Sequence, residues 1–182
     1  MTLIIDIFFS TILGIIFLPI ILILSILIYI FDGLPIFYRS KRVGKNLKLF
    51  NIYKFRTMKN NSKKEEITFL GKILRRTSLD EIPQLLNILK GEMSLVGPRP
   101  LPKEIINKIV IKKRVIRASI KPGITGYTQI KYSGKKRTLS EKVDLDIFYI
   151  NKKNIWFYLN ILFFTPLVLI KRFFYNKSGN SL

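Results

Sequence analysis

The chain of 182 residues carries 32 Lys and Arg against 11 Asp and Glu, a formal net charge of +21. Such a charge implies an anionic partner: a phosphorylated substrate, an anionic lipid surface or a nucleic acid. The absence of Cys and His excludes disulfides, thiolate chemistry, imidazole bases and the usual zinc sites. The length suits one domain plus a membrane segment. We expect the membrane segment within residues 1–34 and a cytosolic, membrane-associated domain over residues 35–182.

The segment from Leu3 to Phe31 is almost entirely apolar, and Asp6 is its only charged residue. At about 1.5 Å per residue, a straight helix of this length could cross a bilayer. Pro19, which follows Leu18 near the middle, tends to kink a helix. The segment is therefore either a single span or a hairpin that enters and leaves on one face. The basic residues after it place its C-terminal end on the cytoplasmic side in both cases.

Residues 39–64 contain ten Lys or Arg and no acid. Most of them are typical of a polybasic segment beside a membrane, which binds anionic headgroups. Short strands are expected at 35–38 and 50–55, with a turn between them. Lys54 and Arg56 flank Phe55, and this cluster is the better candidate for an anion-binding site.

The stretch from Arg75 to Leu85 brings Asp80 and Glu81 together in a chain with few acids. Ser78 and Glu81 fit a capping box, and apolar residues follow at helical spacing. Both carboxylates are therefore expected at a helix N-terminus, where the helix dipole favours the ionised form of an acid. Capped surface helices are common, so this motif alone does not identify a site.

Three later stretches add to this pattern. Pro98-Arg99-Pro100 forms a stiff loop that holds one guanidinium in place, which suits bidentate phosphate recognition. A basic helix is expected over 101–117, and a glycine-punctuated loop running into a strand over 121–130. The apolar segment 156–170 predicts an interfacial helix with Trp156 and Tyr158 at the level of the headgroups, or alternatively a second span.

Together these stretches resemble the small bacterial sugar transferases, which are monotopic phosphoglycosyl transferases that act on polyprenol phosphate. The resemblance rests on the proline-containing apolar segment and on the motifs at 54–58, 75–85, 90–100 and 122–130, and it covers nearly the whole chain. Three stretches depart from the family pattern, and one of them is Tyr132-Ser133-Gly134, which stands where the family usually has Asn-Gly-Arg. Leu18-Pro19 stands where the family usually has Ser-Pro, and Gly126-Tyr127-Thr128-Gln129 stands where it commonly has Gly-Trp-Ala-Gln.

The resemblance implies transfer of a sugar 1-phosphate from a UDP-sugar to undecaprenyl phosphate with release of UMP, the first membrane step of polysaccharide or glycoconjugate synthesis. It implies that Asp80 is the nucleophile of a covalent phosphosugar intermediate, that Glu81 is its partner, and that Mg²⁺ is required. A carboxylate that attacks a diphosphate needs cations to offset the repulsion between like charges, and Asp80 and Glu81 could hold Mg²⁺. The residues expected to bind substrate or phosphate are Lys54, Arg56, Arg75, Pro98, Arg99, Pro100 and Gln129.

The implied fold is α+β and mainly helical, with a re-entrant membrane helix broken at Leu18 and Pro19 and a small cytosolic catalytic domain carrying interfacial amphipathic helices. The implied location is the bacterial inner membrane, with the active site on the cytoplasmic face. The expected partners are the UDP-sugar, undecaprenyl phosphate, membrane lipids and the glycosyltransferases that act next, with no nucleic acid. The alternatives are a non-catalytic, membrane-anchored basic module that binds nucleic acid or anionic lipid, and the catalytic tail of a larger transferase. The apolar segment directly after Met1 favours a complete small form.

Overall fold

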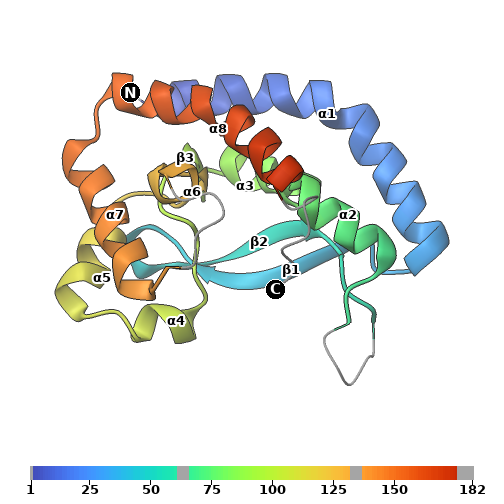
Figure 1. The fold of residues 1–182 in the computed structure, drawn as a ribbon, viewed down its shortest axis with the longest axis horizontal. Helices are drawn as coiled ribbons and strands as arrows, with labels where there is room; N and C mark the ends of the chain where they lie inside the picture. Colours follow the sequence, from blue (N-terminus) through green and yellow to red (C-terminus); the bar gives the residue numbers. More distant parts are fainter. Residues whose placement is uncertain (1, 61–65, 132–136, 176–182) are drawn as a thin grey trace.

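The computed structural model describes residues 2–60, 66–131 and 137–175 (Figure 1). The described part is mainly helical and contains two small two-stranded sheets, which confirms the expected mixture of helix and strand. The sequence also predicts a polar linker at 60–66, and most of it lies outside the described residues. The helices are α1 (Thr2–Asp32), α2 (Phe69–Thr77), α3 (Leu85–Leu89), α4 (Lys103–Asn107), α5 (Ile111–Arg117), α6 (Tyr127–Lys131), α7 (Leu139–Lys152) and α8 (Ile155–Tyr175), with short 3₁₀-helices η1 (Lys45–Leu47) and η2 (Leu79–Gln84).

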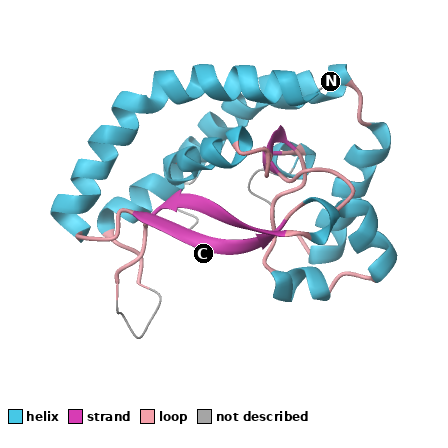
Figure 2. Cartoon of the chain, turned by 180° about the vertical axis from the view of Figure 1, so that it is seen from behind, coloured by secondary structure: helices cyan, strands magenta, loops and turns pink. Residues whose placement is uncertain are grey.

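Strands β1 (Phe37–Val43) and β2 (Leu49–Phe55) form the antiparallel hairpin that the sequence predicts. Phe37 pairs with Phe55 at the open end, and Val43 pairs with Leu49 beside the turn. The turn contains Asn46 with a φ of 54°, a conformation that Asn tolerates better than most residues. Figure 2 shows the hairpin crossing the molecule beneath α1. The hairpin thus connects two distant parts of the domain.

The second sheet pairs β3 (Ser94–Val96) with β4 (Gly123–Thr125) in parallel. A Cβ atom added at Gly123 would lie 2.1 Å from the backbone nitrogen of Gly97, so only glycine permits this approach. The expected order of loop and then strand at 121–130 is wrong, because β4 comes first and α6 follows. The carbonyl oxygen of Gly126 accepts hydrogen bonds from the backbone N–H groups of Gln129 and Ile130, which turns the chain into a helix.

The single helix expected over 101–117 is two short helices, α4 and α5. Val110 between them has extended backbone dihedrals, with φ −52° and ψ 135°. The break allows Ile106 and Ile109 to be buried together in a cluster with Val43 and Val143. Burial of these apolar side chains therefore outweighs the helical propensity of a continuous basic segment.

The predicted capping box at Ser78 is wrong. Ser78 adopts the left-handed conformation, with a φ of 59°, and its side chain makes no capping hydrogen bond. It ends α2, and η2 begins at the next residue, so the chain reverses where the sequence predicted a continuous helical start. Asp80 and Glu81 lie in the first turn of η2, a 3₁₀-helix rather than an α-helix.

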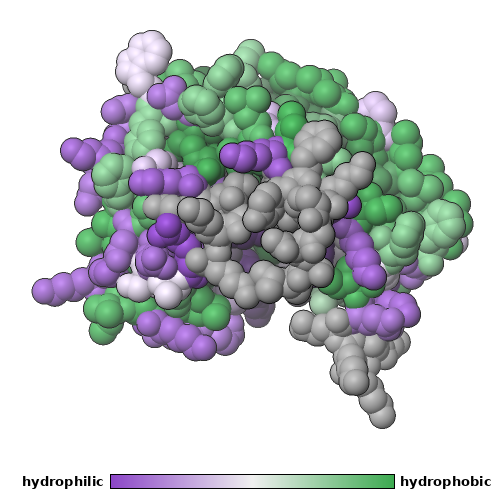
Figure 3. Space-filling model, in the orientation of Figure 1, coloured by the Kyte–Doolittle hydropathy of each residue, from purple (hydrophilic) through white to green (hydrophobic). Residues whose placement is uncertain are grey.

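Helix α1 runs without interruption through Pro19, so the expected break at Leu18 and Pro19 is not seen as a gap in the helix. The helix bends instead and arches over the domain (Figure 1). A proline removes one backbone donor, and a long helix accommodates that loss by curving. This helix is long and apolar enough to cross a membrane, by length and composition. Hydrophobic side chains cover it, whereas hydrophilic ones gather on the side of the molecule that carries α4, α5 and α7 (Figure 3).

Both halves of α1 contact the rest of the domain. In the first half, the buried Asp6 accepts three hydrogen bonds at its Oδ1 atom, from the hydroxyls of Ser94 (3.0 Å) and Tyr158 (2.5 Å) and from the backbone N–H of Leu95 (2.8 Å). In the second half, Leu24 and Ile28 form a buried cluster with Phe55 and Leu74.

Helix α8 forms as predicted, but only one of the two aromatic residues expected at the level of the headgroups is exposed. Trp156 is 75% exposed, whereas Tyr158 is fully buried and not at a headgroup surface. Tyr158 turns inward because Asp6, at the far end of the sequence, supplies a buried acceptor for its hydroxyl. It packs with Ile161 in the main core, which joins α8 to α3, β2 and β3.

Candidate active site

The carboxylate pair on η2 lies against two cations that come from other elements. The Nζ atom of Lys54, near the end of β2, is 2.6 Å from Oε1 of Glu81 and 3.8 Å from Oδ2 of Asp80. A guanidinium nitrogen (Nη2) of Arg99, from the loop after β3, is also 2.6 Å from Oε1 of Glu81. The fold therefore gathers four of the predicted site residues, which the sequence separates by up to 45 positions, into one ionic cluster.

The two adjacent acids have different environments. Burial raises the pKa of the Glu81 carboxyl, but the charges and hydrogen bonds of Arg99 and Lys54 outweigh it, so this pKa lies below its usual value. Burial also raises the pKa of Asp80, and the Glu81 charge raises it further, against the lowering effects of Lys54, Arg75 and Arg99. The net pKa of Asp80 is raised, so a helix-terminal environment does not favour its ionised form as the sequence predicted. Glu81 is therefore the carboxyl group of the pair that ionises more readily, whereas the Asp80 carboxylate is less stabilised and more basic.

The Pro98-Arg99-Pro100 loop presents one exposed cation between two buried prolines. The backbone N–H of Gly123 donates to the Pro98 carbonyl oxygen at 3.0 Å, which anchors the loop to β4. The Arg99 carbonyl oxygen accepts a 2.5 Å hydrogen bond from Nη2 of Arg117. With the backbone held at both positions, the Arg99 side chain is directed to Glu81 at little further cost in entropy.

Arg117 belongs to a buried network that sequence reasoning missed. Its Nε atom is 2.8 Å from Oδ2 of Asp146 on α7, and the hydroxyl of Thr128 donates to the other carboxylate oxygen at 2.7 Å. The side chains of Arg117 and Asp146 are only 6% and 8% exposed. The cluster around Asp146 is visible in the sequence as an acidic patch, but no local spacing pairs it with an arginine 29 residues earlier.

The other predicted site residues divide into two groups. Arg75 lies close enough for its charge to lower the pKa of Asp80, and its Nε donates to the Thr57 hydroxyl at 2.8 Å. Arg56 lies apart from the ionic cluster: its guanidinium is buried and donates to backbone carbonyls of residues 32–34, where it holds the C-terminal end of α1. The Gln129 amide donates to the Ile124 carbonyl oxygen and fixes the turn between β4 and α6, so no contact brings it to the carboxylates.

The pair Asp80–Glu81 fits the way proteins hold Mg²⁺. This ion is usually bound through one or two carboxylates, with water and substrate phosphates completing the octahedron. Within residues 2–60, 66–131 and 137–175, no group of three or more acidic, His or Cys side chains could form an all-protein cage. A divalent ion here would therefore share its coordination with the substrate.

Comparison with known proteins decides the family. The model of the family described as bacterial sugar transferase matches residues 1–172. The chain belongs to this family. Its membership confirms the resemblance seen in the motifs and the prediction of a transferase enzyme, and it sets aside the non-catalytic module.

Individual relatives agree with this assignment. The chain is 40% identical over 142 residues to a Bacillus subtilis protein described as an uncharacterized sugar transferase, EpsL, covering 73% of this chain and 69% of EpsL. It is 34% identical over 176 residues to the UDP-glucose:undecaprenyl-phosphate glucose-1-phosphate transferase of Escherichia coli, covering 88% of this chain but 38% of that protein. It is 35% identical over 167 residues to the undecaprenyl-phosphate galactose phosphotransferase of Salmonella typhimurium, covering 78% of this chain and 34% of the relative. The chain thus spans well under half the length of these larger relatives.

Proposed function

We propose that this protein transfers a sugar 1-phosphate from a UDP-sugar to undecaprenyl phosphate, with release of UMP. The observation that carries the proposal is the carboxylate pair held between Lys54 and Arg99, in a family whose relatives include sugar-phosphate transferases that act on undecaprenyl phosphate. The cations of this cluster suit a diphosphate, and the raised pKa of Asp80 suits a nucleophile more than a passive ion-pair partner.

The proposed transfer takes place in two steps. In the first, a carboxylate oxygen of Asp80 attacks the phosphorus next to the sugar, and the bond from that phosphorus to the bridging oxygen of the diphosphate breaks, releasing UMP. In the second, a phosphate oxygen of undecaprenyl phosphate attacks the same phosphorus, and the acyl phosphate bond breaks to regenerate the carboxylate. The acceptor is already an anion, so neither step needs a general base, consistent with a chain that has no His.

Lys54 and Arg99 would contact phosphate oxygens when substrate enters and would offset the charge that develops on them. Glu81 holds both cations in place through its ion pairs. Asp80 and Glu81 would also hold Mg²⁺, which supplies charge neutralisation for the diphosphate. The product would be a sugar linked through a diphosphate to the membrane-bound undecaprenyl chain, and it would begin a polysaccharide or glycoconjugate.

We further infer that α1 is re-entrant and that the active site faces the cytoplasm. Both halves of α1 contact the same domain, through Asp6 in the first half and through Leu24 and Ile28 in the second. A straight span would carry one end away from that domain, to the opposite side of the bilayer. The basic hairpin after α1 belongs on the cytoplasmic side by its charge. Exposed apolar side chains on α2 and α8, including Phe69 and Phe163, support contact of these helices with the membrane interface.

The test is UMP release by the purified, membrane-reconstituted protein with undecaprenyl phosphate, Mg²⁺ and a panel of UDP-sugars. We expect UMP release with a specific UDP-sugar donor. The rate of UMP release should be lower by roughly 1,000-fold or more in Asp80→Asn. Asp144→Asn is the matched control, because Asp144 pairs with Lys113 on the exposed surface and should keep full activity. Folded protein that releases no UMP across the panel, and that binds nucleic acid tightly instead, would overturn the proposal.

A further inference from the structure

A second group of cations surrounds a cavity of about 140 Å³ that the transfer chemistry does not use. Its lining includes Lys45, Lys121 and Lys153, the hydroxyl residues Thr2 and Ser94, and the apolar Leu3. Lys45 lies in the turn of the hairpin, whereas Lys54 lies near the opposite end of β2. At about 3.3 Å per residue, the part of the strand from Leu49 to Lys54 alone separates the backbones of Lys45 and Lys54 by roughly 16 Å. The cavity is therefore distinct from the carboxylate pair.

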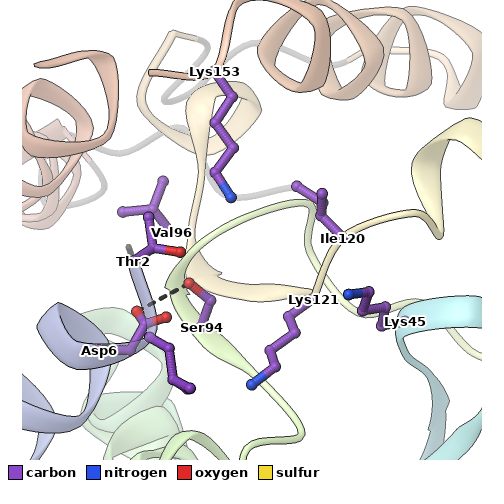
Figure 4. A pocket seen from close by; sticks show the side chains of 9 residues that line it. Thr2, Asp6, Lys45, Ser94, Val96, Ile120, Lys121 and Lys153 are labelled. Atoms are coloured by element: carbon purple, nitrogen blue, oxygen red, sulfur yellow. Dashed lines mark hydrogen bonds between the residues drawn. The ribbon is translucent and has the colours of Figure 1, made fainter. Parts of the chain in front are cut away.

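The fold brings the three lysines together from separate elements. Lys45 comes from the hairpin turn, Lys121 precedes β4, and Lys153 joins α7 to α8. Figure 4 shows their side chains arranged around the same opening, from different sides. Partial burial and the charge of Lys45 lower the pKa of the Lys153 ammonium, against the raising effect of the Asp6 carboxylate. Ammonium groups gathered in this way repel one another, and a bound anion would remove that cost.

Asp6 is the acidic residue that lines this cavity, and its carboxylate already accepts hydrogen bonds. Its Oδ1 atom accepts hydrogen bonds from Ser94, Leu95 and Tyr158. These bonds fix the wall of the cavity, and the Ser94 hydroxyl lies at its surface. Three lysines against one hydrogen-bonded aspartate leave the lining positively charged, as an anion site requires.

The cavity opens beside the apolar surface of the molecule. Leu3 in its lining is 49% exposed, and its neighbour Ile4 on α1 is 76% exposed. On the other side, Lys153 lies directly before α8, whose Trp156 is 75% exposed. Cations at the border of an exposed apolar face match an amphiphile, whose phosphate lies at the headgroup level while its chains lie along the apolar helices.

We propose that this cavity binds the phosphate group of an anionic phospholipid headgroup, with the lipid chains lying along the first turns of α1. The length of β2 between Lys45 and Lys54 places this lipid site apart from the carboxylate pair, so the lipid held here is distinct from the acceptor in transfer. The same phosphate chemistry is present in free inorganic phosphate, so the test distinguishes the two sources. This inference does not depend on the proposed transferase reaction.

The test measures thermal unfolding of the purified protein in a neutral detergent during titration with short-chain phosphatidylglycerol, short-chain phosphatidylcholine or inorganic phosphate. We expect a saturable rise of the unfolding temperature with phosphatidylglycerol alone. The triple variant Lys45→Gln, Lys121→Gln, Lys153→Gln should bind it at least roughly tenfold more weakly. The control triple variant Lys41→Gln, Lys108→Gln, Lys112→Gln removes the same charge from exposed lysines outside the cavity and should bind within about twofold of the parent protein.

Equal weakening in the two triple variants would overturn the proposal, because it would show binding to overall charge. Equal stabilisation by phosphatidylcholine would overturn it too, as would full reproduction of the effect by inorganic phosphate at the same concentration. Circular dichroism checks that each variant is folded. If the cavity triple variant does not fold, the single variants Lys45→Gln and Lys153→Gln replace it; both side chains are exposed, and each should weaken binding by roughly threefold.

Discussion

Asp80 and Glu81 are neighbours in the chain but have opposite pKa shifts, and this difference is the main feature of the site at the scale of the residue. Glu81 receives both direct contacts at 2.6 Å, so its carboxylate is stabilised. Asp80 has Lys54 at 3.8 Å and keeps a raised pKa because of burial. Two carboxylates in different environments can serve different roles, one as the attacking group and one as the residue that positions the cations.

The first prediction concerns Lys54→Met. The Lys54 charge lowers the pKa of Asp80, so its removal should raise that pKa further. In the proposed mechanism Asp80 reacts as the carboxylate, so the activity of the enzyme should be lost as pH falls through the pKa of Asp80. The acidic limb of the kcat/KM profile should therefore move to higher pH, and activity at neutral pH should fall roughly 100-fold. Lys59→Met, which removes an exposed lysine, is the control. An acidic limb at the same pH in Lys54→Met would remove Lys54 from the site.

At the scale of the element, the site depends on how short segments are anchored. The loop that carries Arg99 is held by backbone hydrogen bonds to β4 and by the buried Arg117, which itself pairs with Asp146 on α7. Burial raises the pKa of Asp146, and the Arg117 charge and the Thr128 hydrogen bond oppose that rise. A buried ion pair of this kind is costly to break from one side only.

The second prediction separates stability from positioning. Arg117→Met should leave Asp146 buried without its cation and destabilise the protein by about 3 kcal/mol, which lowers the unfolding temperature by roughly 10 °C. Adding Asp146→Leu should recover much of the stability but not the activity, because the Arg99 carbonyl oxygen still lacks its donor. Thermal unfolding and KM for the donor measure the two effects.

The exposed pair Lys113–Asp144 provides the control for this cycle. Lys113→Met with Asp144→Leu should change the unfolding temperature by no more than about 2 °C. Full recovery of both stability and KM in the Arg117→Met, Asp146→Leu protein would show that the pair does not position Arg99.

Local signals in the sequence predict the hairpin, the apolar helices and the basic and acidic motifs, because turn chemistry and hydrophobic periodicity act over a few residues. They fail where distant residues compete. Tyr158 turns inward to meet Asp6, and Val110 breaks a helix so that Ile109 can be buried. Spacing along the strand groups Arg56 with Lys54, but the Arg56 guanidinium donates to carbonyl groups just after α1. Ser78 satisfies a capping pattern, yet the chain reversal between α2 and η2 uses it in the left-handed conformation.

At the scale of the whole molecule, α1 determines where the site lies relative to the bilayer. The helix arches over the domain and contacts it in both halves (Figure 1). A re-entrant helix would leave the carboxylate pair and the acceptor phosphate on the same face of the membrane, as the proposed second step requires.

The third prediction tests this topology with cysteines, which the natural chain lacks. Thr2→Cys lies at the start of α1 and Leu34→Cys lies just after its end, and both should be shielded from an impermeant thiol reagent added outside intact cells. Both should react once the membrane is opened. Labelling of Thr2→Cys from outside, with Leu34→Cys still protected, would instead establish a single span.

If Asp80 carries the sugar phosphate covalently during transfer, an intact-protein mass measurement should detect the modified enzyme. The purified protein is mixed with its UDP-sugar and Mg²⁺ without undecaprenyl phosphate. We expect a burst of UMP that approaches one per protein, and a mass gain equal to the sugar phosphate that maps to Asp80 and is absent from Asp80→Asn. Adding undecaprenyl phosphate should remove the added mass. UMP release that begins only when both substrates are present, with no mass gain at Asp80, would rule out the covalent intermediate and indicate direct transfer between the substrates.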